Sequence, residues 1–204
     1  MLKRIIKRKI KRYIFTPIIM RKYLACTKIK KLNIGACNQY LEGWLNVDLK
    51  SPHKKVIYMD ARKIFPFRNN SFNYIFNEHM IEHLTFNEAE FMLKECIRIL
   101  VPGGKIRIAT PNLDVICCIK KRNNKNKVYV KWIMDKWLPN LSKQKIYGEC
   151  FVINNMFYNF GHRFIYDSET LKYLLRKTGF KDIKKYNSGY SKDFNLTNLE
   201  SHGL

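Results

Sequence analysis

The sequence lacks a long apolar run. No stretch approaches the roughly 20 consecutive apolar residues that a membrane-spanning helix needs. The N-terminus also lacks the apolar core of a secretory signal, because basic residues recur through Arg12. We therefore predict a cytoplasmic protein, with peripheral contact to the inner surface of the membrane as an open alternative.

Paired cysteines are missing as well. The six cysteines form no Cys-x-x-Cys pair and show no spacing typical of a disulfide framework. This pattern indicates reduced thiols, as in the cytosol. The hydrophobic fraction of 46% argues against disorder, and 204 residues suffice for one domain with a basic extension.

Acidic residues are absent from residues 1–31, although this segment holds 12 of the 39 lysines and arginines. The other 173 residues carry 27 basic and 16 acidic side chains, which leaves them a balance of +11 out of the total of +23. A strongly basic balance favours an anionic partner, such as a membrane surface, a nucleic acid or an acidic glycan.

Residues 1–15 place apolar and basic side chains on opposite faces of a helical period, and Pro17 is expected to end or bend this helix. Such a helix can lie in an anionic membrane interface. It can equally be a solvated leader that packs one face on the domain. We treat residues 1–30 as a basic amphipathic N-terminal extension and residues 31–204 as the main domain.

Strands alternate with turns and helices from residue 31 onward. We predict strands over 31–34, 44–47, 55–59, 72–76 and 105–109, a helix over 87–100, a second helix from Asp167 that Gly179 ends, and a last strand over 180–186. Residues 112–160 are predicted to form a helical insertion or lid. This order implies an α/β fold, Rossmann-like and doubly wound, with a mostly parallel sheet.

Three successive predicted strands end in a glycine or an acid, namely Gly35, Asp48 and Asp60. A glycine turn lets the backbone approach a ligand at the carboxyl edge of a parallel sheet. An acid on the neighbouring strand can accept hydrogen bonds from both hydroxyls of a ribose, and Asp60 is placed to contact the adenine side. A Rossmann-like domain for some other nucleotide is the alternative.

The residues around these ends resemble the small type 11 group of class I S-adenosylmethionine-dependent methyltransferases. The matching motifs include Asn33-Ile34-Gly35, then Gly43-Trp44-Leu45-Asn46-Val47-Asp48, and later Pro102-Gly103-Gly104, over about residues 31–187. The resemblance implies the seven-stranded methyltransferase sheet, with a last strand that the sequence leaves unclear, and S-adenosylmethionine as the cofactor. The cofactor-binding residues that it implies are Asn33, Gly35, Ala36, Cys37, Asp48, Leu49, Asp60, Ala61, Asn77 and Glu78.

Within that set, the resemblance assigns the methionine part of the cofactor to the Gly35 turn, the ribose to Asp48 and the adenine to Asp60. Asn77 and Glu78 would face the methyl donor. The turn continues as Ala36-Cys37-Asn38, where the family has more glycine, so weakened cofactor binding is one expectation.

Histidines follow the fourth predicted strand and precede the last helix. His79 or His83 is the candidate general base that removes a proton from an acceptor hydroxyl. The alternative is that both order the loop, which we prefer for His83. His162 and Arg163, with Tyr166, are candidate substrate residues; alternatively they bond loop carbonyls.

The stretch from His79 to His83 also fits the His-x-x-Glu-His pattern of some zinc peptidases. The context favours a methyltransferase, and the sequence offers no clear third ligand. We therefore predict no metal.

Three functions follow from these patterns. The first is methyl transfer to a hydroxyl of a small molecule or glycan. The second is methylation of a nucleic acid, which the charge would suit, although Asn77-Glu78-His79 differs from the Asn-Pro-Pro-Tyr type of signature. The third is a degenerate domain that binds the cofactor without turnover.

Overall fold

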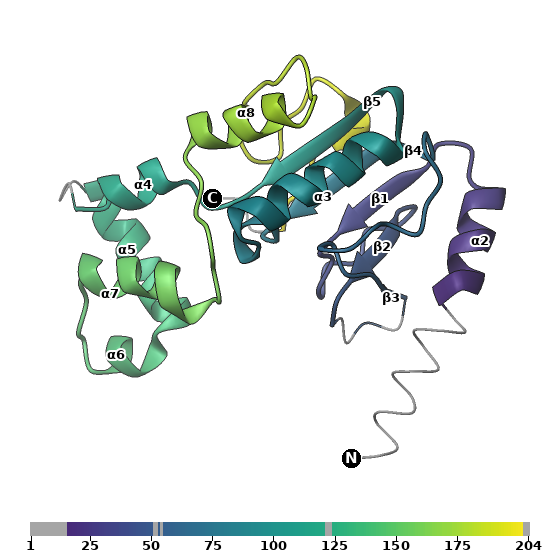
Figure 1. The fold of residues 1–204 in the computed structure, drawn as a ribbon. Helices are drawn as coiled ribbons and strands as arrows, with labels where there is room; N and C mark the ends of the chain where they lie inside the picture. The colour runs from purple at the N-terminus through teal and green to yellow at the C-terminus, as the bar shows by residue number, and fades with distance from the viewer. Residues whose placement is uncertain (1–15, 51–52, 54, 121–123, 202–204) are drawn as a thin grey trace.

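The computed structural model describes residues 16–201, apart from 51–52, 54 and 121–123. Five parallel strands in this part form one sheet in the order β3-β2-β1-β4-β5 (Figure 1). The strands are β1 (Lys31–Ile34), β2 (Leu45–Asp48), β3 (Ile57–Tyr58), β4 (Phe72–Glu78) and β5 (Leu100–Ala109). The strand order reverses beside β1, and every carboxyl end lies at the same edge. The predicted α/β, Rossmann-like, mostly parallel sheet is confirmed.

Helices α3 (Phe86–Ile99) and α8 (Ser168–Lys177) cover one face of this sheet (Figure 1). The apolar side of α3 is fully buried and includes Ala89, Met92 and Leu93, which lie in the same core as residues of β1 and β2. Thr85 begins α3 in a capping box with Glu88, so two backbone groups that a helix start leaves unpaired are satisfied there. This helix holds the loop that follows β4 against the sheet.

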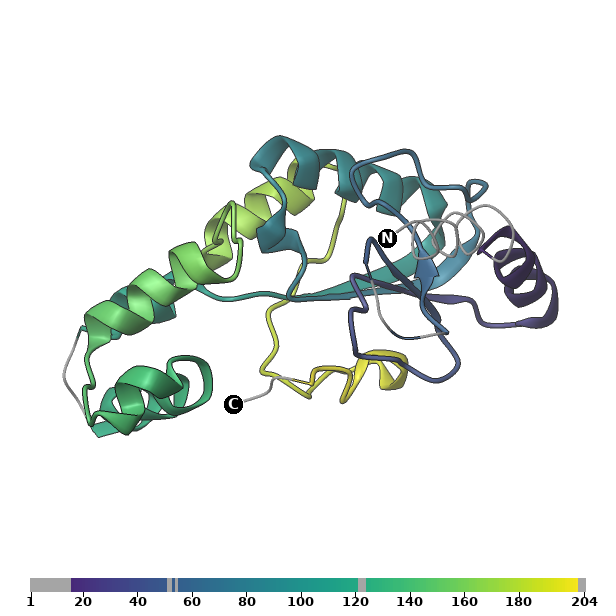
Figure 2. The ribbon, with the colours of Figure 1, turned by 90° about the horizontal axis from the view of Figure 1, so that it is seen from below.

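The opposite face is covered by the C-terminal segment, which contains the short 3₁₀ helix η4 (Phe194–Leu196) (Figure 2). Leu196 packs there with Trp44 and Phe76. The connection from β1 to β2 contains no helix that could cover this face. Instead, Asn33 and Asn46 form a buried amide pair whose hydrogen bonds hold the carbonyls of Gln39 and Leu41.

Helix α2 (Thr16–Cys26) packs beside β3, where the hydroxyl of Thr16 accepts a hydrogen bond from the amide of Tyr58. Pro17 lies in the first turn of this helix, a position that needs no amide donor. The helical pattern predicted for residues 1–15 lies outside the described residues. No helix of the described part is long and apolar enough to cross a bilayer.

Residues 113–159 form a group of helices with its own core. These are α4 (Leu113–Cys118), α5 (Asn124–Trp137), α6 (Pro139–Lys143), α7 (Glu149–Asn154) and the π-helix η3 (Asn155–Asn159). Ile116, Met134 and Val152 are among the buried residues at its centre. Figure 1 shows this group to one side of the sheet. That it acts as a lid stays a prediction.

The structure corrects two of the predicted strands. Residues 180–186 form no strand, because Asp182 has a φ of +52° and breaks the extended backbone. Phe180 and Ile183 pack against the core nonetheless. Strand β5 begins at Leu100 rather than at Lys105, and residues 101–104 bulge out between the paired ends of β4 and β5.

Candidate functional site

The turn after β1 brings backbone to the carboxyl edge of the sheet. Gly35 has a φ of +79°, and its amide and that of Ala36 both donate to the carbonyl of Val47. A Cβ at Gly35 would lie 2.5 Å from Cγ of Met80, so both the conformation and the space require glycine. Cys37 then turns with a φ of +42°. The compact turn thus forms without the additional glycines of the family.

Asp48 lies beside this turn at the end of β2. Its Oδ2 accepts the amide of Cys37 at 2.9 Å, and its Oδ1 accepts the amide of Lys50 at 2.6 Å. A carboxylate has about four lone-pair sites, so it can accept two further hydrogen bonds from a ligand. Its neighbour Leu49 is 39% exposed. The structure therefore brings Gly35, Cys37 and Asp48 together.

Asp60 follows β3 and is held by a residue that the sequence analysis missed. Both of its carboxylate oxygens accept from the Arg62 guanidinium at 2.9 Å. This hydrogen bond, which outweighs the effect of burial, lowers the pKa of Asp60. The acid two residues before an arginine was the available signal. Asp60 is thus a fixed anion at the strand end, and Ala61 beside it packs on the core.

Asn77 and Glu78 end β4, and both are buried. Asn77 Nδ2 donates to the carbonyl of Ile34 at 3.0 Å, whereas its Oδ1 has no hydrogen-bond partner in the described structure. Glu78 accepts the amide and the hydroxyl of Ser201. The C-terminal segment therefore closes against the strand end, a contact between distant residues that the sequence could not reveal.

Asn33 has a different environment from the rest of the predicted cofactor set. Its side chain is 1% exposed and bonds Asn46 and the carbonyl of Gln39. The connection from β1 to β2 therefore covers Asn33, and its visible contacts hold that connection in place.

His79 and Glu82 form an ion pair in the loop after β4. His79 Nδ1 lies 3.1 Å from Glu82 Oε1, and the Glu82 side chain is completely buried. Burial of the imidazole is the largest single effect and opposes its protonation, but the hydrogen bond to Glu82 and the negative charges of Glu82 and Glu78 together outweigh it and raise the pKa of His79. Thr110, just after β5, donates to the other oxygen of Glu82 at 3.0 Å. Glu82 was not among the predicted site residues.

His83 and His162 meet edge to face, with ring centroids 5.0 Å apart. His83 Nδ1 lies 3.3 Å from the carbonyl of Gly161, and His162 Nδ1 lies 2.6 Å from that of Met156. Burial lowers the pKa of His162, which favours the neutral imidazole. Both histidines do bond loop carbonyls, and they also stand beside Glu82.

Arg163 and Tyr166 complete the predicted substrate set, and their contacts are structural. Arg163 pairs with Glu88 at 2.8 Å, and its amide donates to the carbonyl of Glu82. Tyr166 is 1% exposed and its hydroxyl has no partner among the described residues, so burial raises its pKa.

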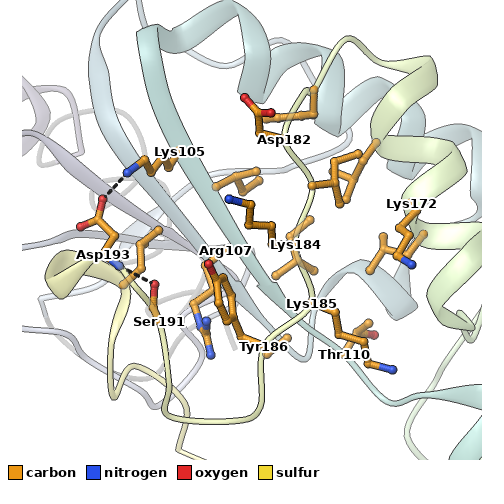
Figure 3. A pocket seen from close by; sticks show the side chains of 18 of the residues that line it. Lys105, Arg107, Thr110, Lys172, Asp182, Lys184, Lys185, Tyr186, Ser191 and Asp193 are labelled. Carbon is orange, nitrogen blue, oxygen red and sulfur yellow. Dashed lines mark hydrogen bonds and ion pairs between the residues drawn. The ribbon is translucent and has the colours of Figure 1, made fainter.

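A groove of about 1220 Å³ starts at Glu78 and His79 and runs along the outer edge of β5. The segment that follows α8 forms its other wall, with Lys184 and Tyr186 facing the strand (Figure 3). Lys105 pairs with Asp193 across one end, and Lys185 donates to the hydroxyl of Ser168. The groove thus joins the histidine loop to a lysine-rich surface.

Comparison with known protein families finds a match over part of the chain. Residues 33–108 match the model of a methyltransferase domain family. No curated protein matches the sequence significantly.

Three solved structures were compared with the chain. A S-adenosylmethionine-dependent methyltransferase from Archaeoglobus fulgidus is 16% identical, with a TM-score of 0.51, over 89% of this chain and 75% of that one. Phosphoethanolamine N-methyltransferase 2 of Haemonchus contortus is 19% identical, with a TM-score of 0.42, over 87% of this chain and 39% of that one. A putative methyltransferase of Haloferax volcanii, solved with its Trm112 activator, is 12% identical, with a TM-score of 0.44, over 79% of this chain and 67% of that one. Only the first supports the fold.

Proposed function

We propose that this chain, a class I S-adenosylmethionine-dependent methyltransferase, methylates a hydroxyl group of a small molecule or glycan. The observation that carries the proposal is the convergence of Gly35, Asp48 and Asp60 at one edge of the parallel sheet, within the segment that matches the methyltransferase domain.

The residues fit the cofactor at two points. The turn at Gly35 has no room for a Cβ, so the backbone itself forms the wall of the cradle. Asp48 is held by two backbone amides and keeps lone pairs for a ribose. Asp60 with Ala61 would border the adenine, and Asn77 with Glu78 would close the methionine side. S-adenosylmethionine supplies a methyl group on a sulfonium, and transfer to the acceptor oxygen forms a C–O bond, breaks the S–C bond and releases the hydroxyl proton.

The chain contributes mainly by positioning. A sulfonium is already an activated methyl donor, so holding the acceptor oxygen in line supplies much of the rate. His79 and His83 stay candidates for receiving the proton, and His162 and Arg163 with Tyr166 stay candidates for shaping the acceptor side. The contacts of Arg163 and Tyr166 favour an indirect role for both.

The groove beside β5 supports an extended acceptor over a very small one. It begins at His79 and continues past Thr110 to exposed lysines of the segment after α8. The hydroxyl and ammonium groups that line this groove would suit a sugar chain that carries negative charge. Part of the chain's basic charge therefore lines a groove next to the proposed reaction centre. The same charge would also suit a nucleic acid.

Asp48→Asn tests cofactor binding. Removing this charge weakens a charge-assisted hydrogen bond, so we expect the affinity for S-adenosylmethionine to fall about ten- to hundredfold by isothermal titration calorimetry. Asp114→Asn is the matched control, because Asp114 is exposed in α4 among the separate helices. Equal affinities of the two variants, or a wild type that binds no cofactor, would contradict the proposal.

The acceptor class is tested by transfer of a radiolabelled methyl group to cell extracts. We expect label in carbohydrate material that resists nuclease and mild base, since a methyl ether survives base and a methyl ester does not. Label that nuclease releases would favour nucleic acid instead. Cofactor binding without any transfer would favour the degenerate domain.

A further inference from the structure

Three potential metal ligands converge on one point beside the proposed acceptor site. Glu82, His83 and His162 each offer one ligand atom, and these atoms all lie within 4.8 Å of one another. Glu82 Oε1 and His162 Nε2 are 4.0 Å apart. Two residues come from the loop after β4 and the third from the segment before α8, so packing of the domain creates the cluster.

Main-chain carbonyls orient both imidazole rings. His162 Nδ1 bonds the carbonyl of Met156, which directs Nε2 toward Glu82. His83 Nδ1 faces the carbonyl of Gly161, which leaves Nε2 as its candidate ligand atom. Histidines that bind metals almost always have this arrangement, because a bond from the second nitrogen fixes the ring and its tautomer.

The environment of Glu82 also suits a cation. Its side chain is 0% exposed, and its ion-pair partners in the described part of the chain are the imidazoles of His79 and His162. A buried carboxylate is costly unless it is paired or binds a metal. His79 lies on one side of it and is itself 42% exposed. His162 is 6% exposed, so the carboxylate is closed to water where it faces this residue.

We infer that Glu82, His83 and His162 bind a divalent transition-metal ion, of which zinc fits best. Two histidines and one glutamate are a known ligand set of catalytic zinc sites, and three protein ligands leave a position for water or a substrate oxygen. The ligand atoms would have to move closer together to reach bonding distance of about 2.0–2.2 Å. This inference replaces the expectation of no metal, which rested on the missing third ligand.

The cluster differs from the zinc-peptidase pattern in the sequence. There, His79 and His83 would bind the ion from one helix. In the structure the chain is a 3₁₀ turn at Ile81–His83, and His79 hydrogen-bonds Glu82 instead of joining the cluster. His79 and Thr110 would thus support the ligand Glu82 from outside. A role of the ion in holding the acceptor hydroxyl rests on the proposed function, whereas metal binding itself does not.

The test measures metal binding by the full chain. Protein is stripped with a chelator, dialysed and titrated with Zn²⁺ by calorimetry, and bound metal is counted by mass spectrometry. We expect one ion per chain and a rise in melting temperature on binding. His83→Ala and His162→Ala should each weaken binding at least about tenfold. Because His162 is buried, circular dichroism checks that the His162→Ala variant is folded. If this variant unfolds, the test rests on His83→Ala, whose site is more accessible.

Two controls separate this cluster from other metal-binding groups. His53→Ala removes a histidine of the loop between β2 and β3 and should leave binding unchanged. Alkylation of the exposed thiols, Cys117 and Cys118 among them, should also leave one ion bound. The inference is overturned if stripped wild type takes up no zinc, if both cluster variants bind like wild type, or if alkylation abolishes binding. Loss of cofactor binding in Asp48→Asn with zinc binding intact would separate the two sites.

Discussion

Gly35 illustrates how one residue can be required for two separate reasons. Its φ of +79° is a conformation that L-residues adopt at a cost of about 1–2 kcal/mol. The adjacent Met80 side chain also occupies the space that a Cβ would need. Glycine is therefore both a conformational and a packing requirement at the proposed cofactor edge.

Gly35→Ala should consequently destabilise the protein more than Gly43→Ala. Gly43 has a similar φ of +75°, but nothing lies within 4 Å of its Cβ position. We expect Gly43→Ala to lower the free energy of unfolding by about 1–2 kcal/mol, from the backbone conformation alone. Gly35→Ala should cost about 1–3 kcal/mol more from the clash. Urea denaturation measures both.

Removing the Met80 side chain isolates the clash. In the double variant Gly35→Ala with Met80→Gly, which lacks both the Cβ and the Cγ of residue 80, the substitution at position 35 should cost only about as much as Gly43→Ala, measured against Met80→Gly alone. A full penalty that persists without Met80 would show that the contact is not its cause.

At the scale of elements, a single ion pair ties α3 to the connection between β3 and β4. Glu95 accepts two hydrogen bonds from Arg98, at 2.8 and 2.6 Å, and one from the amide of Phe65 at 2.7 Å. Arg98 in turn donates to the carbonyls of Phe65 and Phe67. The connection has no regular structure of its own, so these bonds hold it on the helix.

Glu95→Gln should lower the free energy of unfolding by about 1–3 kcal/mol at pH 7. The hydrogen bonds from Arg98, which outweigh burial, lower the folded-state pKa of Glu95. The wild-type advantage is therefore full above the unfolded pKa of about 4.3 and is lost as the pH falls through the folded pKa.

Denaturant titrations between pH 7 and pH 3 measure this advantage. The control is Glu169→Gln, whose carboxylate is 77% exposed beside Lys172 and should contribute little. A difference between wild type and Glu95→Gln that stays constant as the pH falls would contradict the assignment.

At the scale of the whole molecule, charge is concentrated at the N-terminus. Residues 1–15 contain seven lysines and arginines and no acid. Each basic residue near an anionic lipid surface gains about 1 kcal/mol. The segment precedes α2, which packs beside β3.

Deleting residues 1–15 should therefore weaken binding to vesicles of anionic lipid in a flotation assay, while the full chain floats. Neither form should float with vesicles of neutral lipid, and binding of the full chain to anionic vesicles should weaken with added salt. If both forms float equally with anionic vesicles, residues 1–15 are not a membrane anchor. Cofactor titration of the shortened chain checks that the domain is intact.

The sequence alone determined the parts of this protein that depend on local patterns. The apolar period of α3, and the glycine and acids that end β1, β2 and β3, are readable because helix faces and strand ends repeat at fixed spacings. The last predicted strand is wrong because a single left-handed residue, Asp182, breaks the extended backbone. An alternation of apolar and basic residues does not reveal such a conformation.

Only the tertiary structure decided which distant side chains meet. Ser201 closes on Glu78, and His162 comes to lie beside Glu82, 80 positions earlier in the chain. Such contacts depend on how the helices and the C-terminal segment pack around the sheet, and packing is set by the whole chain at once.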